Sequence, residues 1–262
     1  VNVSPTLDFR YRFSKVSNLR INYRGTTSQP SMSDLLDITD DSDPLNITKG
    51  NPGLKPSFTN NFRLFYNTYL QEHQRAIMTF VNYSNTRNSI SNLVTYDEKT
   101  GGRTTRPENI NGNWNVSGAF MFNTAIDSTG YWNINTFTNI NYNNYVGYVS
   151  IDNKSNSQKN TTRTTSLAER LSGSFRNSWL EVSLDGSVNY THARNLLQSQ
   201  KNLDTWQFAY GGSLNFYMPW GMSIATDMHQ NSRRGFNDNS MNTNELIWNA
   251  QLSQSFLKGK AL

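Results

Sequence analysis

The 262-residue chain contains no cysteine, and it has no long run of apolar residues. The fold therefore uses no disulfide, which fits a protein that passes through an oxidising compartment without needing one. A transmembrane helix is excluded, because it needs about twenty consecutive apolar residues. The net charge is only +5 and no basic run is present, so the sequence does not indicate a nucleic-acid partner.

Hydropathy is also low. The mean hydropathy is -0.68 and apolar residues make up 35% of the chain, values typical of soluble or disordered proteins. The aromatic content of 13% argues against disorder, since disordered chains are poor in aromatic residues. A β-barrel wall explains both observations, because every second residue of its strands faces a watery interior.

The clearest pattern lies in residues 205–218, where apolar and polar residues alternate. One face carries Trp206, Phe208, Tyr210, Gly212, Leu214, Phe216 and Met218. Such alternation predicts a strand that is apolar on one side and polar on the other. This strand is about twice the usual length and suits a tilted crossing of a bilayer. The sequence therefore predicts an all-β fold, an antiparallel transmembrane β-barrel.

Similar patterns predict eleven strands along the chain. They lie at residues 5–13, 19–27, 58–70, 76–95, 110–126, 131–150, 165–176, 179–194, 204–218, 221–232 and 243–257. Short and long connections alternate, as periplasmic turns and extracellular loops do in bacterial outer-membrane barrels. An odd number of strands departs from the even number of such barrels. We therefore expect a segment of a longer protein, which also supplies the export signal that Val1-Asn2-Val3 does not provide.

The six tryptophans are predicted to lie at strand ends. Trp114, Trp206 and Trp248 follow long connections, whereas Trp132, Trp179 and Trp220 lie beside short ones. Aromatic rings of this kind gather at headgroup depth in the two girdles of a membrane barrel. The alternative is a soluble β-sandwich with aromatic residues in its core. In the predicted strand 76–95, two sets of apolar residues compete for the outer face, Ile77, Thr79, Val81 and Tyr83 against Met78 and Phe80.

A family resemblance rests mainly on residues 1–70. It is carried by Pro5-Thr6-Leu7, Tyr11-Arg12-Phe13-Ser14-Lys15, Asn18-Leu19-Arg20-Ile21-Asn22-Tyr23, Gln29-Pro30-Ser31 and, most specifically, Asn51-Pro52-Gly53-Leu54-Lys55-Pro56. These segments resemble the barrel of TonB-dependent outer-membrane receptors, especially the type common in Bacteroidetes. An acidic residue often follows the last proline in that family, where this chain has Ser57. The later chain is similar in strand rhythm and in its Phe256-Leu257-Lys258-Gly259 turn.

The resemblance implies a plugged barrel of about twenty-two strands, with residues 1–262 as a single segment of the later wall. The N-terminal plug and the final strands would lie outside this chain. It also implies import of an extracellular ligand across the bacterial outer membrane, with long loops outside the cell and short turns in the periplasm. The implied partners are outer-membrane lipid, the plug, an inner-membrane energy-coupling protein and a surface lipoprotein. We expect no cofactor, metal site or catalytic residue.

The motif Asn51–Pro56 has a structural interpretation and a functional one. Pro52 and Pro56 fix φ, and Gly53 permits a turn between them, so we expect a rigid loop base; direct contact with a ligand is the alternative. The preceding loop carries acidic residues, namely Asp34, Asp37, Asp40, Asp41 and Asp43. Their oxygens are of the kind that binds Ca²⁺, but without calcium-loop spacing, so we expect solvated surface charge.

The first predicted hairpin concentrates positive charge on its polar face. With a turn centred near Val16, Phe13 opposes Leu19, Tyr11 opposes Ile21 and Phe9 opposes Tyr23. The polar face then pairs Asp8 with Arg24, Arg10 with Asn22 and Arg12 with Arg20. Like charges opposite each other are unfavourable. We therefore predict that Arg10, Arg12, Arg20 and Arg24 contact a plug domain or an anionic solute; hydrated charges are the alternative.

Two other functions remain open. Asp227 and His229 resemble one half of an omptin-like protease site, where a carboxylate and an imidazole could activate water. The second acidic pair of such a site is not apparent, because Asp185 lies mid-strand without a neighbouring carboxylate. The other alternative is a passive pore or structural barrel, whose wall would have the same chemistry as that of an importer.

Overall fold

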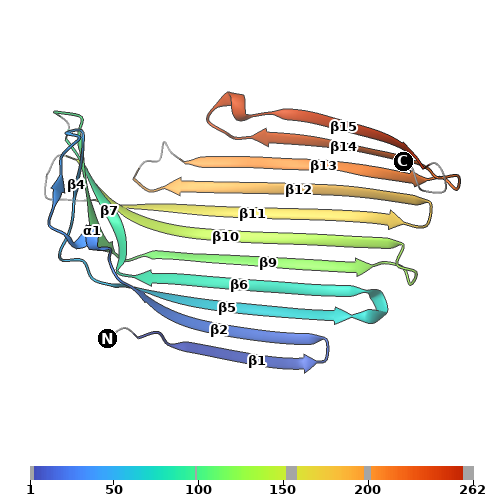
Figure 1. Ribbon diagram of the computed structural model, residues 1–262, viewed down its shortest axis with the longest axis horizontal. Coiled ribbons are helices and arrows are strands. Elements are labelled where there is room, and N and C mark those ends of the chain that lie inside the picture. Colours follow the sequence, from blue (N-terminus) through green and yellow to red (C-terminus); the bar gives the residue numbers. More distant parts are fainter. Residues whose placement is uncertain (1–2, 98, 152–157, 198–201, 256–262) are drawn as a thin grey trace.

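The computed structural model describes residues 3–97, 99–151, 158–197 and 202–255. Within them, eleven strands form one continuous wall in chain order, each antiparallel to the next (Figure 1). They are β1 (Thr6–Ser14), β2 (Ser17–Ser28), β5 (Ser57–Leu70), β6 (Arg75–Arg87), β9 (Asn113–Ala125), β10 (Trp132–Ile151), β11 (Gln158–Arg176), β12 (Leu180–Asn195), β13 (Leu203–Tyr217), β14 (Met222–Arg234) and β15 (Asn244–Gln254). The predicted antiparallel β fold and its eleven long strands are confirmed.

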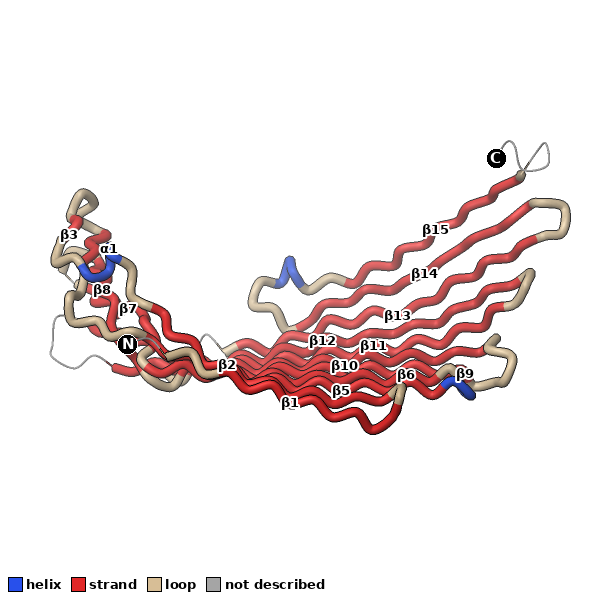
Figure 2. The backbone as a smooth tube through the Cα atoms, turned by 60° about the horizontal axis from the view of Figure 1, so that its bottom comes forward, coloured by secondary structure: helices blue, strands red, loops and turns tan. Residues whose placement is uncertain are grey.

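The wall is a single curved layer (Figure 2). In the part of the chain that the structure describes, no second sheet packs on either side of it. Large apolar side chains of many wall strands are therefore exposed, as Leu184 is at 68%. A soluble sandwich would bury these side chains between two sheets, so this alternative is wrong. Among the described strands, β1 and β15 are the two edges of the wall, each paired on one side only.

The predicted strand 76–95 is wrong in one respect, because it breaks at Asn88. This residue has a positive φ of 51°, a left-handed conformation that asparagine adopts more readily than most residues. The chain leaves the wall there, and β7 (Ser89–Tyr96) pairs with β8 (Arg103–Ile110) and, in parallel, with the end of β10. All of β8 except Ile110, the first residue of the predicted strand 110–126, lies in a segment that we predicted as a loop.

The long loop after β2 also contains ordered structure. It forms α1 (Met32–Leu35), β3 (Thr39–Asp40) and β4 (Asn46–Lys49). The strand β4 pairs with β3 and, in parallel, with β8. Together β3, β4, β7 and β8 build an extension of the sheet at one end of the wall (Figure 1). We call these four strands the loop-end extension.

The connections at the opposite end of the wall are short. The β5–β6 turn contains η1 (Gln71–His73), and the longer β14–β15 loop at the loop end contains η3 (Asn239–Met241). The described helices are too short and too polar to cross a membrane. The strand β11 begins at Gln158, earlier than predicted, and the predicted turn at Phe256–Gly259 lies outside the described residues. Short turns therefore alternate with long loops, as predicted.

Candidate functional site on the polar face

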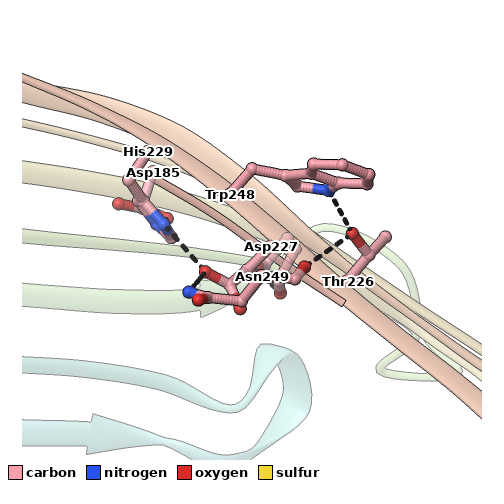
Figure 3. A network of polar contacts seen from close by, with 8 residues as sticks. Asp185, Thr226, Asp227, His229, Trp248 and Asn249 are labelled. Carbon is pink, nitrogen blue, oxygen red and sulfur yellow. Dashed lines mark hydrogen bonds and ion pairs between the residues drawn. The ribbon is translucent and has the colours of Figure 1, made fainter. Parts of the chain in front are cut away.

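The strand register assigns each wall residue to one of two faces. Residues opposite each other in a ladder point to the same side of the sheet, so a face can be followed from strand to strand. We call the side of Trp206 the apolar face and the side of Gln207 the polar face. Figure 3 shows Trp248 on the opposite side of the wall from Asp227 and Asn249.

The same register resolves the two competing apolar sets of the predicted strand 76–95. Ile77 lies opposite Phe122 and Val81 opposite Gly118, all on the apolar face. Met78 and Phe80 therefore lie on the polar face. Both are apolar residues on a mostly polar face, and alternation alone could not assign them to it.

Aromatic side chains form two rows on the apolar face. The row near the loop end joins five strands through ring pairs 4.6–6.3 Å apart, Tyr23–Phe62, Phe62–Tyr83, Tyr83–Trp114 and Trp114–Tyr142. The row near the turn end includes the pairs Trp132–Phe175 at 4.8 Å and Trp179–Phe216 at 5.7 Å. On β10 the two rows are separated by about ten residues, which at ~3.3 Å each and ~40° tilt span about 25 Å. That is the height of the apolar band of a membrane barrel.

Five of the six tryptophans lie at or beside strand ends, as predicted. Trp248 does not, because it lies opposite Met228, midway along β14. Its indole Nε1 donates a hydrogen bond to Thr226 Oγ1 over 2.9 Å. We interpreted Trp248 as opening β15, but this strand begins at Asn244, close to the start of the predicted range 243–257.

The polar face of β12–β15 brings a histidine between two carboxylates. His229 Nε2 lies 3.2 Å from Asp185 Oδ1, and His229 Nδ1 lies 3.5 Å from Asp227 Oδ2. Asn249 Nδ2 donates to the same Asp227 oxygen over 3.0 Å. The contact with Asp185 crosses β13 at Gly211, whose missing side chain leaves room for the imidazole: an added Cβ would lie 2.5 Å from its ring.

This arrangement corrects the expectation that Asp185 has no carboxylate nearby. Asp185 and Asp227 share one imidazole, although 42 residues separate them in sequence. Each ring nitrogen faces a carboxylate, one on β12 and one on β14. The imidazole therefore forms a polar bridge between β12 and β14 across β13.

The first hairpin has a register two residues away from the predicted one. Arg10 lies opposite Arg20, Asp8 opposite Asn22 and Arg12 opposite Asn18. Asp8 binds both arginines of the like-charged pair, with distances of 2.9 Å to Arg10 Nε and 2.7 Å to Arg20 Nη2. The acidic partner of Arg20 is therefore in the same hairpin. The predicted register failed because a two-residue slip leaves the faces unchanged.

The motif Asn51–Pro56 is held against the loop-end extension. Asn51 is buried and its Nδ2 donates to the carbonyl oxygen of Pro107 over 2.9 Å. Asn109 exchanges hydrogen bonds with the backbone of Lys55, donating over 2.9 Å and accepting over 2.7 Å. Leu54 is buried as well. These contacts favour the rigid loop base, and any ligand contact by the motif stays a prediction.

The acidic loop uses several carboxylates within itself. The hydroxyl and backbone N–H of Ser42 donate to Asp40 and lower the pKa of this carboxyl below its usual value. Asn46 and the backbone N–H of Leu45 do the same for the pKa of Asp43. Among the described residues, no group of three potential ligands is placed to hold a metal ion. The carboxylates of Asp40 and Asp43 thus accept hydrogen bonds from residues of their own loop.

Sequence reasoning missed one residue on the apolar face. Glu169 lies between Leu167 and Leu171 on that face of β11, about midway between the two aromatic rows. Its carboxyl oxygens accept hydrogen bonds from Thr136 Oγ1 at 2.6 Å and Thr138 Oγ1 at 2.5 Å. Strict alternation along residues 165–176 was the available signal, because it places Glu169 among leucines.

Comparison with known proteins identifies the family. The model of the outer membrane protein beta-barrel family matches residues 1–177, more than half of the chain. The chain belongs to that family. In an outer-membrane β-barrel the apolar face meets lipid and the polar face lines the interior. We therefore call the two sides of this wall the outer face and the inner face.

Similarity to individual proteins is more distant. No curated protein sequence matches the chain. Among solved structures, the copper transporter OprC is similar over 96% of this chain with 11% identity and a TM-score of 0.49. This chain covers 40% of the length of that transporter. Copper transport is a property of OprC and is not assigned to this outer-membrane β-barrel.

Proposed function

We propose that this chain forms part of the wall of a plugged receptor of the TonB-dependent type, which imports or binds an extracellular ligand. The observation that carries the proposal is the open wall of eleven strands, with one unpaired side on both β1 and β15. Bare strand edges are not tolerated within a bilayer. A closed barrel therefore needs further strands, and a barrel of that size has a wide interior that is either plugged or an open channel.

The two ends of the wall suggest its orientation. The long loops and the loop-end extension lie at one end, and the short turns lie at the other (Figure 1). Bacterial barrels keep short turns in the periplasm and long loops outside the cell. In this orientation the rigid base at Asn51 and Asn109 supports a surface for an external ligand or a surface lipoprotein. The short turns face an inner-membrane energy-coupling protein.

Conductance measurements test the plug. The full-length protein that contains this chain is inserted into a planar lipid bilayer, and its current is recorded before and after urea unfolds any interior domain. We expect little current at first and a large, reversible increase in urea. A steady open current without urea would instead establish the passive pore.

The inner-face contacts of His229 support a role without catalysis. Both of its ring nitrogens face carboxylates, so we assign the Asp185–His229–Asp227 group to bracing the wall. Substitution of His229 should leave peptide hydrolysis by the full-length protein at the background level of the wild type. Hydrolysis that disappears with His229→Ala would contradict this assignment.

A further inference from the structure

The inner face of β2 and β5 contains a recess of about 270 Å³ lined by Arg20, Asn22, Arg63 and Phe65. The register explains why these four residues meet. Arg20 lies opposite Phe65 and Asn22 opposite Arg63, on adjacent strands and on the same face. The guanidinium groups of Arg20 and Arg63 therefore lie at diagonal positions of the recess, and Asn22 and Phe65 occupy the other two positions.

Positive charge around this recess exceeds negative charge. Asp8 is the one carboxylate that contacts these arginines in the described chain, and it is shared by Arg10 and Arg20. Arg63 forms no ion pair within the described residues. Guanidinium groups bind carboxylates and phosphates through paired hydrogen bonds. The recess can therefore accept one more anionic group beside Arg63.

An apolar strip continues from Phe65 along the inner face. Phe65 on β5 lies opposite Phe80 on β6. Met121 on β9 lies opposite Met78 on β6 and opposite Phe137 on β10. We call Phe65, Phe80, Met78, Met121 and Phe137 the inner apolar strip. Phe65, Met78 and Met121 are 37–39% exposed. The lumen side of a barrel is usually polar, and exposed apolar patches mark binding surfaces.

We propose that the recess and the inner apolar strip together bind an organic anion with an apolar body. Its carboxylate or phosphate lies between Arg20 and Arg63, and its body lies on Phe65 and the strip. Methionine side chains adapt to ligands of varied shape, which suits the strip to an aliphatic or aromatic body. This inference goes beyond the proposed function: it requires that a plug leaves the recess and the inner apolar strip open to solvent, and it does not depend on energised import.

The test compares two probes that differ only in charge, 4-phenylbutyrate and 4-phenylbutanol. Calorimetric titration uses the full-length protein in detergent, with protein-free micelles as the reference. We expect 4-phenylbutyrate to bind more tightly than the alcohol. Arg63→Gln should lower the affinity for 4-phenylbutyrate about tenfold, because one charge-assisted contact is lost. It should leave the affinity for the alcohol unchanged. Phe65→Ala should lower the affinity for both probes.

A matched control is Arg233→Gln, which removes an inner-face arginine from β14, far along the wall from the recess. It should change neither affinity, and the thermal unfolding temperature of each variant checks that it is folded. Equal binding of both probes, equal effects of Arg63→Gln and Arg233→Gln, or no binding to the wild type would overturn the proposal. The last result would mean that protein covers the strip. The conductance of the same samples reports separately on the plug.

Discussion

The imidazole of His229 lies across Gly211 and reaches Asp185 on the second strand away, with Nε2 3.2 Å from Oδ1. The contact ties β12 to β14 over the intervening β13. Such a bridge is available only where the middle strand has no side chain, since the pleated ladder otherwise fills this space. Gly211 is therefore as much a part of the bridge as the two polar residues.

Substitution of Gly211 should break this bridge. In Gly211→Ala the new Cβ would lie 2.5 Å from the His229 ring and 2.3 Å from the Met228 carbonyl oxygen. We expect a loss of about 1–3 kcal/mol in the free energy of unfolding, the usual cost of overpacking. Urea unfolding of the full-length protein in lipid vesicles measures it. Gly173→Ala is the control, because its Cβ meets nothing within 4 Å; equal stability of the two variants would refute the bridge.

The lipid-facing carboxyl of Glu169 should lower the stability of the wall. A charged or polar group on the outer face near the bilayer midplane is unfavourable, and Thr136 and Thr138 offset only part of this cost. We expect Glu169→Leu to raise the free energy of unfolding in vesicles by about 1–2 kcal/mol. Glu245→Leu, on the inner face near the loop end, should give no such gain. A destabilised Glu169→Leu would indicate that another protein covers this carboxyl in the membrane.

The β9–β10 turn should make stability depend on pH. The hydroxyl of Thr129 and the backbone N–H groups of Trp132 and Tyr131 donate to Asp127 and hold the pKa of this carboxyl below its usual value. Because the folded pKa is lower than the unfolded one, the contribution is present above about pH 4. It disappears as the pH falls through the folded pKa.

Thermal unfolding at pH 7 and pH 3 measures this effect. We expect Asp127→Asn to lower the unfolding temperature at pH 7 and to lower it by less at pH 3. Asp37→Asn is the control, because its carboxylate accepts no hydrogen bond from the described chain. A difference between wild type and Asp127→Asn that is the same at both pH values would rule out the carboxylate's charge as the cause.

The loop base should depend on Asn109. Its side chain bonds to the backbone of Lys55 and also donates to the carbonyl oxygen of Asn88 over 2.9 Å. In Asn109→Ala we expect faster hydrogen exchange in residues 51–56 and unchanged exchange in β12 and β13, since hydrogen bonds protect local segments. Asn92→Ala, an exposed position on β7, serves as the control. Unchanged exchange in 51–56 would show that the motif is rigid on its own.

The sequence was sufficient to predict the strands of the wall, because apolar and polar residues alternate in every strand, from Leu7 on β1 to Leu252 on β15. It was insufficient to predict strand register and strand breaks, on which alternation carries no information. A two-residue slip keeps every residue on its face, so the pairing of Arg10 with Arg20 could not be obtained from the pattern. The break at Asn88 was missed because this single residue separates β6 from β7, without a glycine or proline to mark the turn.

Long-range contacts were the other limit. Asp185 and His229 are 44 residues apart, and only the registers of β12, β13 and β14 together place them on one line. The recess at Arg63 was missed for a similar reason, since β5 joins β2 after a long loop. In contrast, Glu169 could have been recognised from its position between Leu167 and Leu171.

Site-directed spin labelling tests most directly that one side of this wall meets lipid and the other meets water. The chain has no cysteine, so single substitutions label one position each. Tyr210→Cys and Leu214→Cys report on the outer face, and Ala209→Cys and Ser213→Cys on the inner face. In vesicles of the full-length protein, we expect labels at 210 and 214 to collide with lipid-soluble oxygen and those at 209 and 213 with a water-soluble nickel chelate. Accessibility that fails to alternate, or that alternates in the opposite sense, would show that this wall does not line a membrane barrel.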